Sequence, residues 1–474
     1  MTPKRRLKSY KRHCLSYFLK QPHVSDQQPK FSVVNMNTIS MDAADRISQL
    51  PEHIIHHILS LLSTPEVVRL SVLSKTWHQV FNSFPISEFS SSSFLVENSD
   101  RSLEFATFVY NSLLRQCRQY RSIPKFQFSV TDRYFRTCFF TFQQPLQPQL
   151  AKHINRCIRL GTQKGVKELS IYFCVPDYYR LPEATLSVKE LVVCRLAGCI
   201  LSGPINWPSL RELSLKQVKI CDQRIFDNLV FTCPFIEKFA LVECDGLKYL
   251  HLSGLRKLKK VKVKRQSFPL MEKIEIDVVS LHTFSYSPFY FEKTHIDLTS
   301  CKNLEVFKFK GCTESFRKYL KNLNQIKRVT LCIFCYSSSG FEKIVSKVSD
   351  PVLHITHLKL KTYIIEKKGH SLVDVLFCIC RPESLFLVSG RGTNDEFMKI
   401  LCKKLVRRVK HKHYCGGNHL NGWQHDLKGV QIERCGRNGY RKVVTCDAFL
   451  DSLQTLEPKE TIRFEFEWSF NSLP

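Results

Sequence analysis

Apolar residues recur at helical spacing in three consecutive groups between residues 45 and 86. The first group consists of Ile54, Ile55, Ile58, Leu59 and Leu62, each of which has another member three or four positions away. This spacing is typical of an amphipathic helix, and Pro51 just before it favours a helix start. A second helix is predicted after residues 63–65 and a third after Ser74, ending before Pro85. About forty residues cannot bury this much apolar surface among themselves, so we expect the helices to pack on another part of the chain or on another protein.

From Val166 onward a second pattern repeats: an apolar residue, two others, an apolar residue, any residue, and an apolar residue. The first units are Val166/Leu169/Ile171, Val188/Leu191/Val193, Leu210/Leu213/Leu215, Ile236/Phe239/Leu241 and Leu258/Val261/Val263. Their first positions, 166, 188, 210, 236 and 258, lie 22, 22, 26 and 22 residues apart. Looser units follow at Met271/Ile274/Ile276, Leu304/Phe307/Phe309, Ile326/Val329/Leu331, Ile355/Leu358/Leu360 and Leu427/Val430/Ile432.

This period is typical of leucine-rich repeats, in which each repeat adds one short strand to a parallel sheet and returns by a helix or loop. The alternative is an unrelated α/β fold in which such strands recur by chance. We predict an α+β chain: a three-helix domain followed by a curved α/β solenoid with a parallel sheet on its concave face.

The remaining segments give the domain boundaries. We predict a basic, disordered tail over 1–44, the helical domain over 45–86, a linker and cap over 87–164, and degenerate repeats with a C-terminal cap over 165–474. Serine density predicts the linker at Ser87–Ser93. In the cap, apolar spacing predicts helices over Arg101–Cys117 and Gln147–Arg159 and strands over Lys125–Val130 and Phe139–Phe142.

Composition limits the cellular setting. The chain has 474 residues, 43% of them hydrophobic, and no run of eighteen apolar residues, so we expect no membrane span. Its amino terminus is basic rather than apolar, which argues against a secretory signal. Its 20 cysteines are scattered through a long chain, so we expect reduced, mostly buried thiols and a nuclear or cytoplasmic location.

Positive charge is the other compositional signal. The net charge of +29 indicates attraction to acidic partners. The first residues carry a basic cluster, Lys4, Arg5, Arg6, Lys8, Lys11 and Arg12. A nuclear localisation signal, a solvated tail and a transit peptide all fit this cluster, and Met41 is an alternative start that would omit it.

The helical segment resembles an F-box. The resemblance is carried, in order, by Leu50-Pro51, the Ile54/Ile55/Ile58/Leu59 face, Val68–Ser71–Leu73 and the closing Ser74-Lys75-Thr76-Trp77. Thr76 stands where an arginine is common in that family, and we do not expect this difference to abolish binding of the motif to its partner protein. In that family the motif docks onto the Skp adaptor of a Skp–cullin–F-box (SCF) ubiquitin ligase. The resemblance therefore implies an adaptor-binding surface of Leu50, Pro51, Ile54, Ile55, Ile58, Leu59, Val68, Leu73 and Trp77.

The order of an F-box and then degenerate repeats resembles the plant F-box/LRR-repeat proteins. The segment Trp423-x-His425-Asp426-Leu427-Lys428-x-Val430 is similar to one common near the end of that group. The resemblance implies a non-catalytic, substrate-recruiting subunit that reaches the cullin and RING subunits through the adaptor and binds a protein substrate for ubiquitination. The alternatives are a repeat protein outside ubiquitination that binds nucleic acid or acidic partners, and a small-molecule co-receptor.

The strand positions between the inward residues hold a candidate substrate surface. Read from the repeat, these positions carry Lys260, Lys262, Lys264, Lys308, Lys310, Lys359 and Lys361. Such a basic track would receive an acidic or phosphorylated segment; a solvated face on a basic chain is the alternative. We do not expect a nucleic-acid partner, because neither an aromatic–basic stacking platform nor a helix-turn-helix pattern is present.

Candidate metal and catalytic groups lack the required patterns. Cys332-x-x-Cys335 has no second ligand pair nearby. A histidine-rich stretch offers donors without a recognised spacing, at His411, His413, Cys415, His419, His425 and Cys435. Nucleotide-binding glycine patterns and a G-x-S-x-G elbow are absent, and no cysteine is marked as an activated nucleophile. We therefore expect no metal, no cofactor and no catalytic residue.

Overall fold

A computed structural model describes most of the chain after residue 49. The described residues are 50–62, 64–71, 73–91, 101–120, 122–131, 148–174, 178–227, 229–265, 271–288, 294–311, 326–334, 352–363, 369–389, 394–410, 422–436, 439–456 and 460–469. The basic tail over 1–44 and the predicted strand Phe139–Phe142 lie outside them. The chain divides into two compact units, Met1–Leu61 and Leu62–Pro474, so the boundary falls inside the segment that resembles an F-box.

The first unit contains helix α2 (Glu52–Ser60), where the sequence predicts it. Pro51 precedes the helix, and its carbonyl accepts hydrogen bonds from the backbone N–H groups of Ile54 (2.9 Å) and Ile55 (3.2 Å). The proline thus opens the helix at a position where its missing N–H leaves no hydrogen bond unmade.

The second unit begins with the two other predicted helices, α3 (Thr64–Leu70) and α4 (Lys75–Ser83). Ser74 is the N-cap of α4, because its side chain accepts a hydrogen bond of 3.2 Å from the backbone N–H of Trp77. The helix ends at Ser83, two residues before Pro85, which cannot continue a helix. The predicted start and end of the third helix are confirmed.

The predicted serine linker is wrong for its first residues. Glu88–Ser90 forms strand β1, which pairs in parallel with β2 (Lys125–Thr131) at the edge of a large sheet. Phe89 explains the difference, because its side chain is fully buried, with its ring 6.3 Å from those of Phe108 and Phe126. Serine density therefore does not separate this segment from the sheet.

Two helices flank the start of this sheet, α5 (Arg101–Gln119) and α6 (Pro148–Thr162), close to the predicted ranges. They contact each other, and the thiol of Cys157 on α6 donates a hydrogen bond of 3.4 Å to the carbonyl of Ala106 on α5. Phe105 of α5 stacks on Phe128 of β2 at 5.9 Å, which joins the helix to the sheet.

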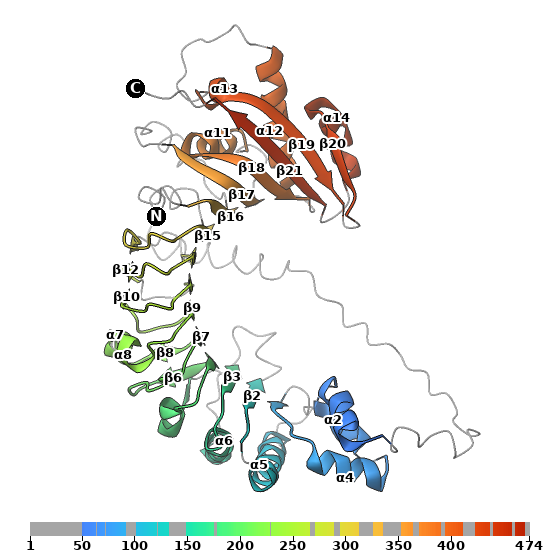
Figure 1. Ribbon diagram of the computed structural model, residues 1–474, viewed down its shortest axis with the longest axis vertical. Helices are drawn as coiled ribbons and strands as arrows, with labels where there is room; N and C mark the ends of the chain where they lie inside the picture. Colours follow the sequence, from blue (N-terminus) through green and yellow to red (C-terminus); the bar gives the residue numbers. More distant parts are fainter. Residues whose placement is uncertain are drawn as a thin grey trace, which may run out of the picture. The chain divides into compact units, whose positions relative to one another are not determined.

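A sheet of 15 described strands, here called the main sheet, runs through the second unit (Figure 1). From β1 to β18 neighbouring strands are parallel. In spatial order the strands are β1, β2, β3 (Glu168–Cys174), β5 (Val193–Ala197), β7 (Glu212–Lys216), β9 (Lys238–Val242), β11 (Lys260–Lys264), β13 (Thr283–Ser287), β15 (Val306–Gly311), β16 (Arg328–Phe334), β17 (Leu353–Tyr363), β18 (Cys380–Val388), β21 (Thr461–Trp468), β19 (Leu427–Cys435) and β20 (Arg441–Val444).

The predicted apolar positions form the core beside this sheet. Leu213 and Leu215 of β7 lie opposite Phe239 and Leu241 of β9, and all four side chains are buried. The same register continues through Val261/Val263, Phe284/Tyr286, Phe307/Phe309, Val329/Leu331, Leu358/Leu360 and Leu385/Leu387. The parallel repeat is therefore confirmed, whereas the curvature and the concave face stay predictions.

The predicted unit Val188/Leu191/Val193 is placed three residues too early. Cys194 of β5 lies opposite Leu169 of β3 and Leu213 of β7, so the unit is Leu191/Cys194/Leu196. The two overlapping patterns are equally apolar, and pairing with both neighbours selects the later one. Val188 instead follows a short 3₁₀ helix, η3 (Glu183–Ser187).

Met271/Ile274/Ile276 is a strand of a different sheet. It corresponds to β12 (Lys273–Asp277), which pairs with β10 (Tyr249–Ser253) and β14 (His295–Asp297). A third sheet holds β4 (Tyr179–Arg180), β6 (Cys199–Leu201) and β8 (Lys219–Ile220). The main sheet has a further unit between the predicted ones, Leu281/Phe284/Tyr286 on β13, and Phe126/Phe128 of β2 and Leu385/Leu387 of β18 extend the same register at its two ends. With both corrections, the first positions 166, 191, 210, 236, 258, 281, 304 and 326 lie 19 to 26 residues apart.

Short helices α7 (Arg224–Asp227) and α8 (Leu229–Thr232) follow β8. The C-terminal cap adds α11 (Gly369–Ile379), α12 (Asn394–Lys410), α13 (Gly422–Asp426), α14 (Cys446–Ser452) and η6 (Leu453–Thr455). Here β21 pairs antiparallel with β18 and β19, and β20 pairs antiparallel with β19. The prediction that Leu427/Val430/Ile432 is a repeat unit is therefore wrong, because these residues lie on β19, and both neighbours of β19 in the sheet are antiparallel to it.

Candidate functional site

Along the parallel strands of the main sheet, every second side chain is buried in the core, and the side chains between them line the opposite face of the sheet. One row crosses five neighbouring strands, β11, β13, β15, β16 and β17. Its members, each opposite the next, are Lys262, Ser285, Lys308, Thr330 and Lys359. The register thus places three of the predicted lysines in one line, on every second strand, with a hydroxyl residue between them. We call this line the lysine row.

Two further rows flank the lysine row on the same strands. One holds Lys260, Thr283, Val306, Arg328 and His357, and the other includes Lys264, Ser287, Lys310, Cys332 and Lys361. None of these positions is buried and none carries a carboxylate. The seven predicted lysines therefore share one exposed, basic face.

The lysines differ in their surroundings. Lys264 forms a partly buried ion pair with Glu243, with 2.5 Å between its Nζ and Oε1 of the carboxylate. Lys310 and Lys361 flank Cys332: burial raises the pKa of this thiol, and the two ammonium groups act in the opposite direction. Within the described residues Lys262, Lys308 and Lys359 make no ion pair, and all three side chains are exposed.

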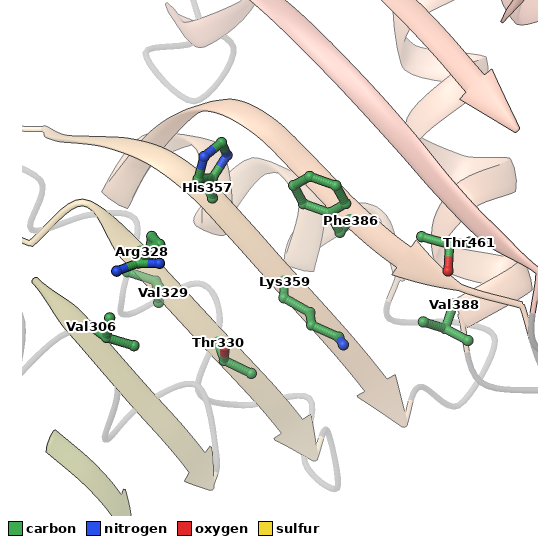
Figure 2. A pocket seen from close by; sticks show the side chains of 9 residues that line it. All are labelled: Val306, Arg328, Val329, Thr330, His357, Lys359, Phe386, Val388 and Thr461. Carbon is green, nitrogen blue, oxygen red and sulfur yellow. The ribbon is translucent and has the colours of Figure 1, made fainter. Parts of the chain in front are cut away.

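A pocket of about 260 Å³ opens at the β17 end of the row (Figure 2). Figure 2 shows its side chains standing on neighbouring strands, with Lys359 beside Thr330 and Phe386. The lining residues are Val306, Arg328, Val329, Thr330, His357, Lys359, Phe386, Val388 and Thr461. Lys359 was predicted from the sequence. Phe386 and Val388 continue the same alternation on β18. Thr461 lies on antiparallel β21, outside the repeats, so the repeat pattern does not predict it.

Hydrogen bonds hold the histidine of this pocket in one orientation. The hydroxyl of Ser384 donates to the carbonyl of Thr356 at 3.1 Å, and its oxygen lies 2.7 Å from Nδ1 of His357. Since the hydroxyl proton is already used, Ser384 accepts from Nδ1–H, which assigns the proton to Nδ1. His357 also meets the edge of Phe386 at 5.9 Å.

Phe386 is fixed from its other side as well. The guanidinium of Arg463 lies 5.5 Å from the centre of its ring, in a cation–π contact. Arg463 is itself held by Glu465, 2.6 Å away. The aromatic wall of the pocket is therefore positioned by contacts on both sides.

The predicted adaptor-binding residues differ in exposure. In the first unit, Leu50 and Ile54 are 37% and 38% exposed, Pro51 is exposed, and Ile55 and Leu59 are buried. In the second unit, Leu73 is 65% exposed and Trp77 is half-buried. Ile58 is also half-buried, and the side chain of Val68 lies outside the described residues. Leu61, 75% exposed, was not predicted.

Thiols and metal donors give no further site among the described residues. No group of three or more His, Cys, Asp or Glu side chains is placed to hold a metal ion in that part of the chain. Of the proposed donors, residues 411–419 and Cys335 lie outside it. The described cysteines are free thiols, and burial raises the pKa of Cys157 and Cys380 to about 12. No described helix combines the length and apolar character needed to cross a membrane.

Two protein-family models match the chain. The F-box domain model matches residues 47–89, and the model described as FBD-associated F-box protein At5g56370, LRR repeats, matches residues 154–284. The matches cover the predicted F-box and the first predicted repeats.

Similar proteins come from Arabidopsis thaliana. Putative F-box/LRR-repeat protein At5g02930 is 25% identical over 369 residues, covering 73% of this chain and 72% of the relative. F-box/LRR-repeat protein 25 is 28% identical over 229 residues, 48% of this chain and 78% of the relative. Putative F-box/LRR-repeat protein At3g18150 is 23% identical over 425 residues, 84% and 79% of the two chains.

Proposed function

Because this chain belongs to the F-box/LRR-repeat proteins, we propose that it is the substrate-recruiting subunit of an SCF ubiquitin ligase. In this proposal the F-box docks onto the Skp adaptor, and through it onto the cullin and RING subunits. The repeats hold the protein substrate. The subunit performs no chemistry itself: it raises the effective concentration of a substrate lysine near the charged ubiquitin carrier.

The observation that carries the proposal is the set of exposed apolar side chains in the matched F-box segment. Leu50, Ile54 and Leu61 are exposed in the first unit, and Leu73 is exposed in the second. Apolar side chains concentrated in a short segment are typical of a protein interaction site, since burying them in a partner removes them from water.

The repeats support the second half of the proposal. Exposed faces of repeat sheets are extended surfaces suited to binding another protein. Here the face keeps its exposed charges in register across the strands from β11 to β17. Such an arrangement recognises a partner by complementary charge.

Co-purification tests the adaptor contact. The full chain, co-expressed with a tagged Skp adaptor, should be retained on the adaptor's affinity resin. The double substitution Leu50→Ala, Pro51→Ala should lose this retention. Phe231→Ala is the matched control: Phe231 is 82% exposed but lies on α8, outside the F-box match, so this variant should be retained. Equal retention of all three proteins would refute the docking assignment.

A further inference from the structure

We propose that the lysine row and the adjoining pocket bind an extended acidic segment whose carboxylates recur at every third residue and whose end carries an apolar side chain. The inference deepens the proposed function, because it names the class of substrate segment that the repeats would hold. It rests on the register and the contacts of the second unit and is independent of adaptor docking.

Spacing along the row sets the repeat of the segment. Adjacent strands of a sheet lie about 4.8 Å apart, so lysines on every second strand stand about 9.6 Å apart. A peptide in the polyproline II conformation advances about 3.1 Å per residue with three residues per turn, so every third side chain lies on the same face, about 9.3 Å from the previous one. A chain lying across the strands therefore places every third side chain over Lys262, Lys308 and Lys359 in turn.

The residues between the lysines suit a peptide backbone. Ser285 and Thr330 occupy the intervening strands of the row. A hydroxyl both donates and accepts hydrogen bonds, so these two side chains match the N–H and C=O groups of the two residues between successive acids. The row thus alternates charge recognition with backbone recognition.

The charge of the row fits carboxylates better than phosphates. Successive lysines of the row stand about 9.6 Å apart, so an anion over the row meets one ammonium group of the row at a time. A phosphoryl group carries about −1.5 to −2 charge at neutral pH and needs more than one cation. Lys262, Lys308 and Lys359 make no ion pair within the described part of the chain, so a carboxylate displaces no internal acid from them.

The pocket supplies the apolar end of the motif. Phe386 lies opposite Lys359 on the next strand, about 4.8 Å further along the row. Val306 and Val388 add apolar wall, and the pocket volume of about 260 Å³ accommodates one side chain of leucine size. An apolar residue two positions beyond the last acid would reach it, with Phe386 already held by His357 and Arg463.

The same face is poorly suited to nucleic acid. Single-strand binders stack successive bases on several aromatic side chains. Across β11 to β18, the rows described above carry two aromatic rings, His357 and Phe386; they contact each other, and Phe386 also contacts Arg463. On the other side of β11 the rows contain Glu168 and Glu212, which limits the length of the basic track.

Fluorescence anisotropy of the full chain tests the proposal. The probe is a labelled peptide with glutamate at every third position over three repeats and leucine two residues beyond each end, so that either chain direction is served. The comparison peptide has the same composition with its three glutamates adjacent. We expect the spaced peptide to bind about tenfold more tightly, and equal affinity would overturn the motif.

Variants then locate the site. Lys308→Gln with Lys359→Gln should weaken the spaced peptide about tenfold, and Phe386→Ala should weaken it several-fold only when the leucines are present. The matched control, Lys219→Gln with Lys248→Gln, removes the same charge from exposed positions at β8 and just before β10. An equal loss in the control would mean general charge attraction and would overturn the site.

Two competing ligands complete the test. A phosphoserine version that binds more tightly than the glutamate peptide would overturn the assignment to carboxylates. The assignment to a peptide would be overturned if a random single-stranded nucleic acid bound more tightly than the glutamate peptide and this binding were lost in the same lysine variant. All measurements are made without the adaptor, so failure of the docking proposal leaves this result unaffected, and the reverse also holds.

Discussion

The indole N–H of Trp423 donates a hydrogen bond of 3.1 Å to the carboxylate of Asp374, which lies 49 residues earlier. The same carboxylate accepts from Lys404 at 2.8 and 3.0 Å. Trp423 is buried and stacks on Phe377 at 4.8 Å. The tryptophan of the C-terminal segment therefore joins three helices of the cap, α11, α12 and α13, and its role is structural.

Replacing Asp374 by alanine should lower the free energy of unfolding by about 3 kcal/mol, because it leaves the Lys404 ammonium and the Trp423 N–H without their acceptor. Both partners of the ion pair are mostly buried, with about 15% of each side chain exposed. Urea denaturation followed by tryptophan fluorescence would measure the change. Asp222→Ala removes an exposed partner of Arg224 and should change stability little; similar losses in the two variants would contradict this account.

Gly198→Ala should prevent normal folding of the repeats. Gly198 adopts φ +68°, which L residues rarely adopt, and an added Cβ would collide with the carbonyl oxygen of Phe173. Gly439 is the matched case: it has φ +76° but no atom within 4 Å of an added Cβ. Gly439→Ala should therefore cost only about 1 kcal/mol, the intrinsic penalty of the left-handed region. Comparison of the two melting temperatures tests whether crowding adds to the backbone penalty.

Ser74→Ala should destabilise α4 by about 1 kcal/mol, because the N–H of Trp77 loses the acceptor that caps the helix. Hydrogen exchange of the α4 amides measures this local effect directly. Ser74→Asp restores an acceptor and adds a negative charge at the positive end of the helix, so it should recover the protection. Loss of protection in both variants would show that the cap is not the cause.

Stability should fall above pH 9. Burial raises the pKa of Cys157 and Cys380 from 9.0 to about 12, so the folded state holds these protons more tightly than the unfolded state. A raised pKa contributes stability that is complete below the unfolded value and is lost as the pH rises from about 9 towards 12. Urea midpoints between pH 7 and 11 should show this fall, and the Cys380→Ala variant should show a shallower slope. An unchanged slope would contradict the assignment.

Much of the fold follows from local signals. The Ser74 cap, Pro85 and the inward residues of β7, β9 and β11 were predicted because each depends on the chemistry of a few neighbouring residues. The lysine face followed as well, since alternation along a strand places every second side chain on the same face.

The errors arise where pairing between distant segments decides the outcome. Two overlapping apolar patterns compete around Leu191, and only the neighbouring strands select the register. The strand containing Ile274 has the same pattern as a main-sheet strand but joins another sheet. Thr461 lines the pocket from β21, which pairs antiparallel with β18 and lies outside the repeat period, so the repeat pattern could not predict it.

The most direct test of the proposed function is the mass of the complex formed by the purified full chain and the Skp adaptor. In size-exclusion chromatography with light scattering, we predict a single peak whose mass equals one 55.3 kDa chain plus one adaptor. The Leu50→Ala, Pro51→Ala protein should instead elute apart from the adaptor while keeping its own melting temperature. Separate peaks for the unmodified chain and the adaptor would contradict the assignment of this protein to an SCF ligase.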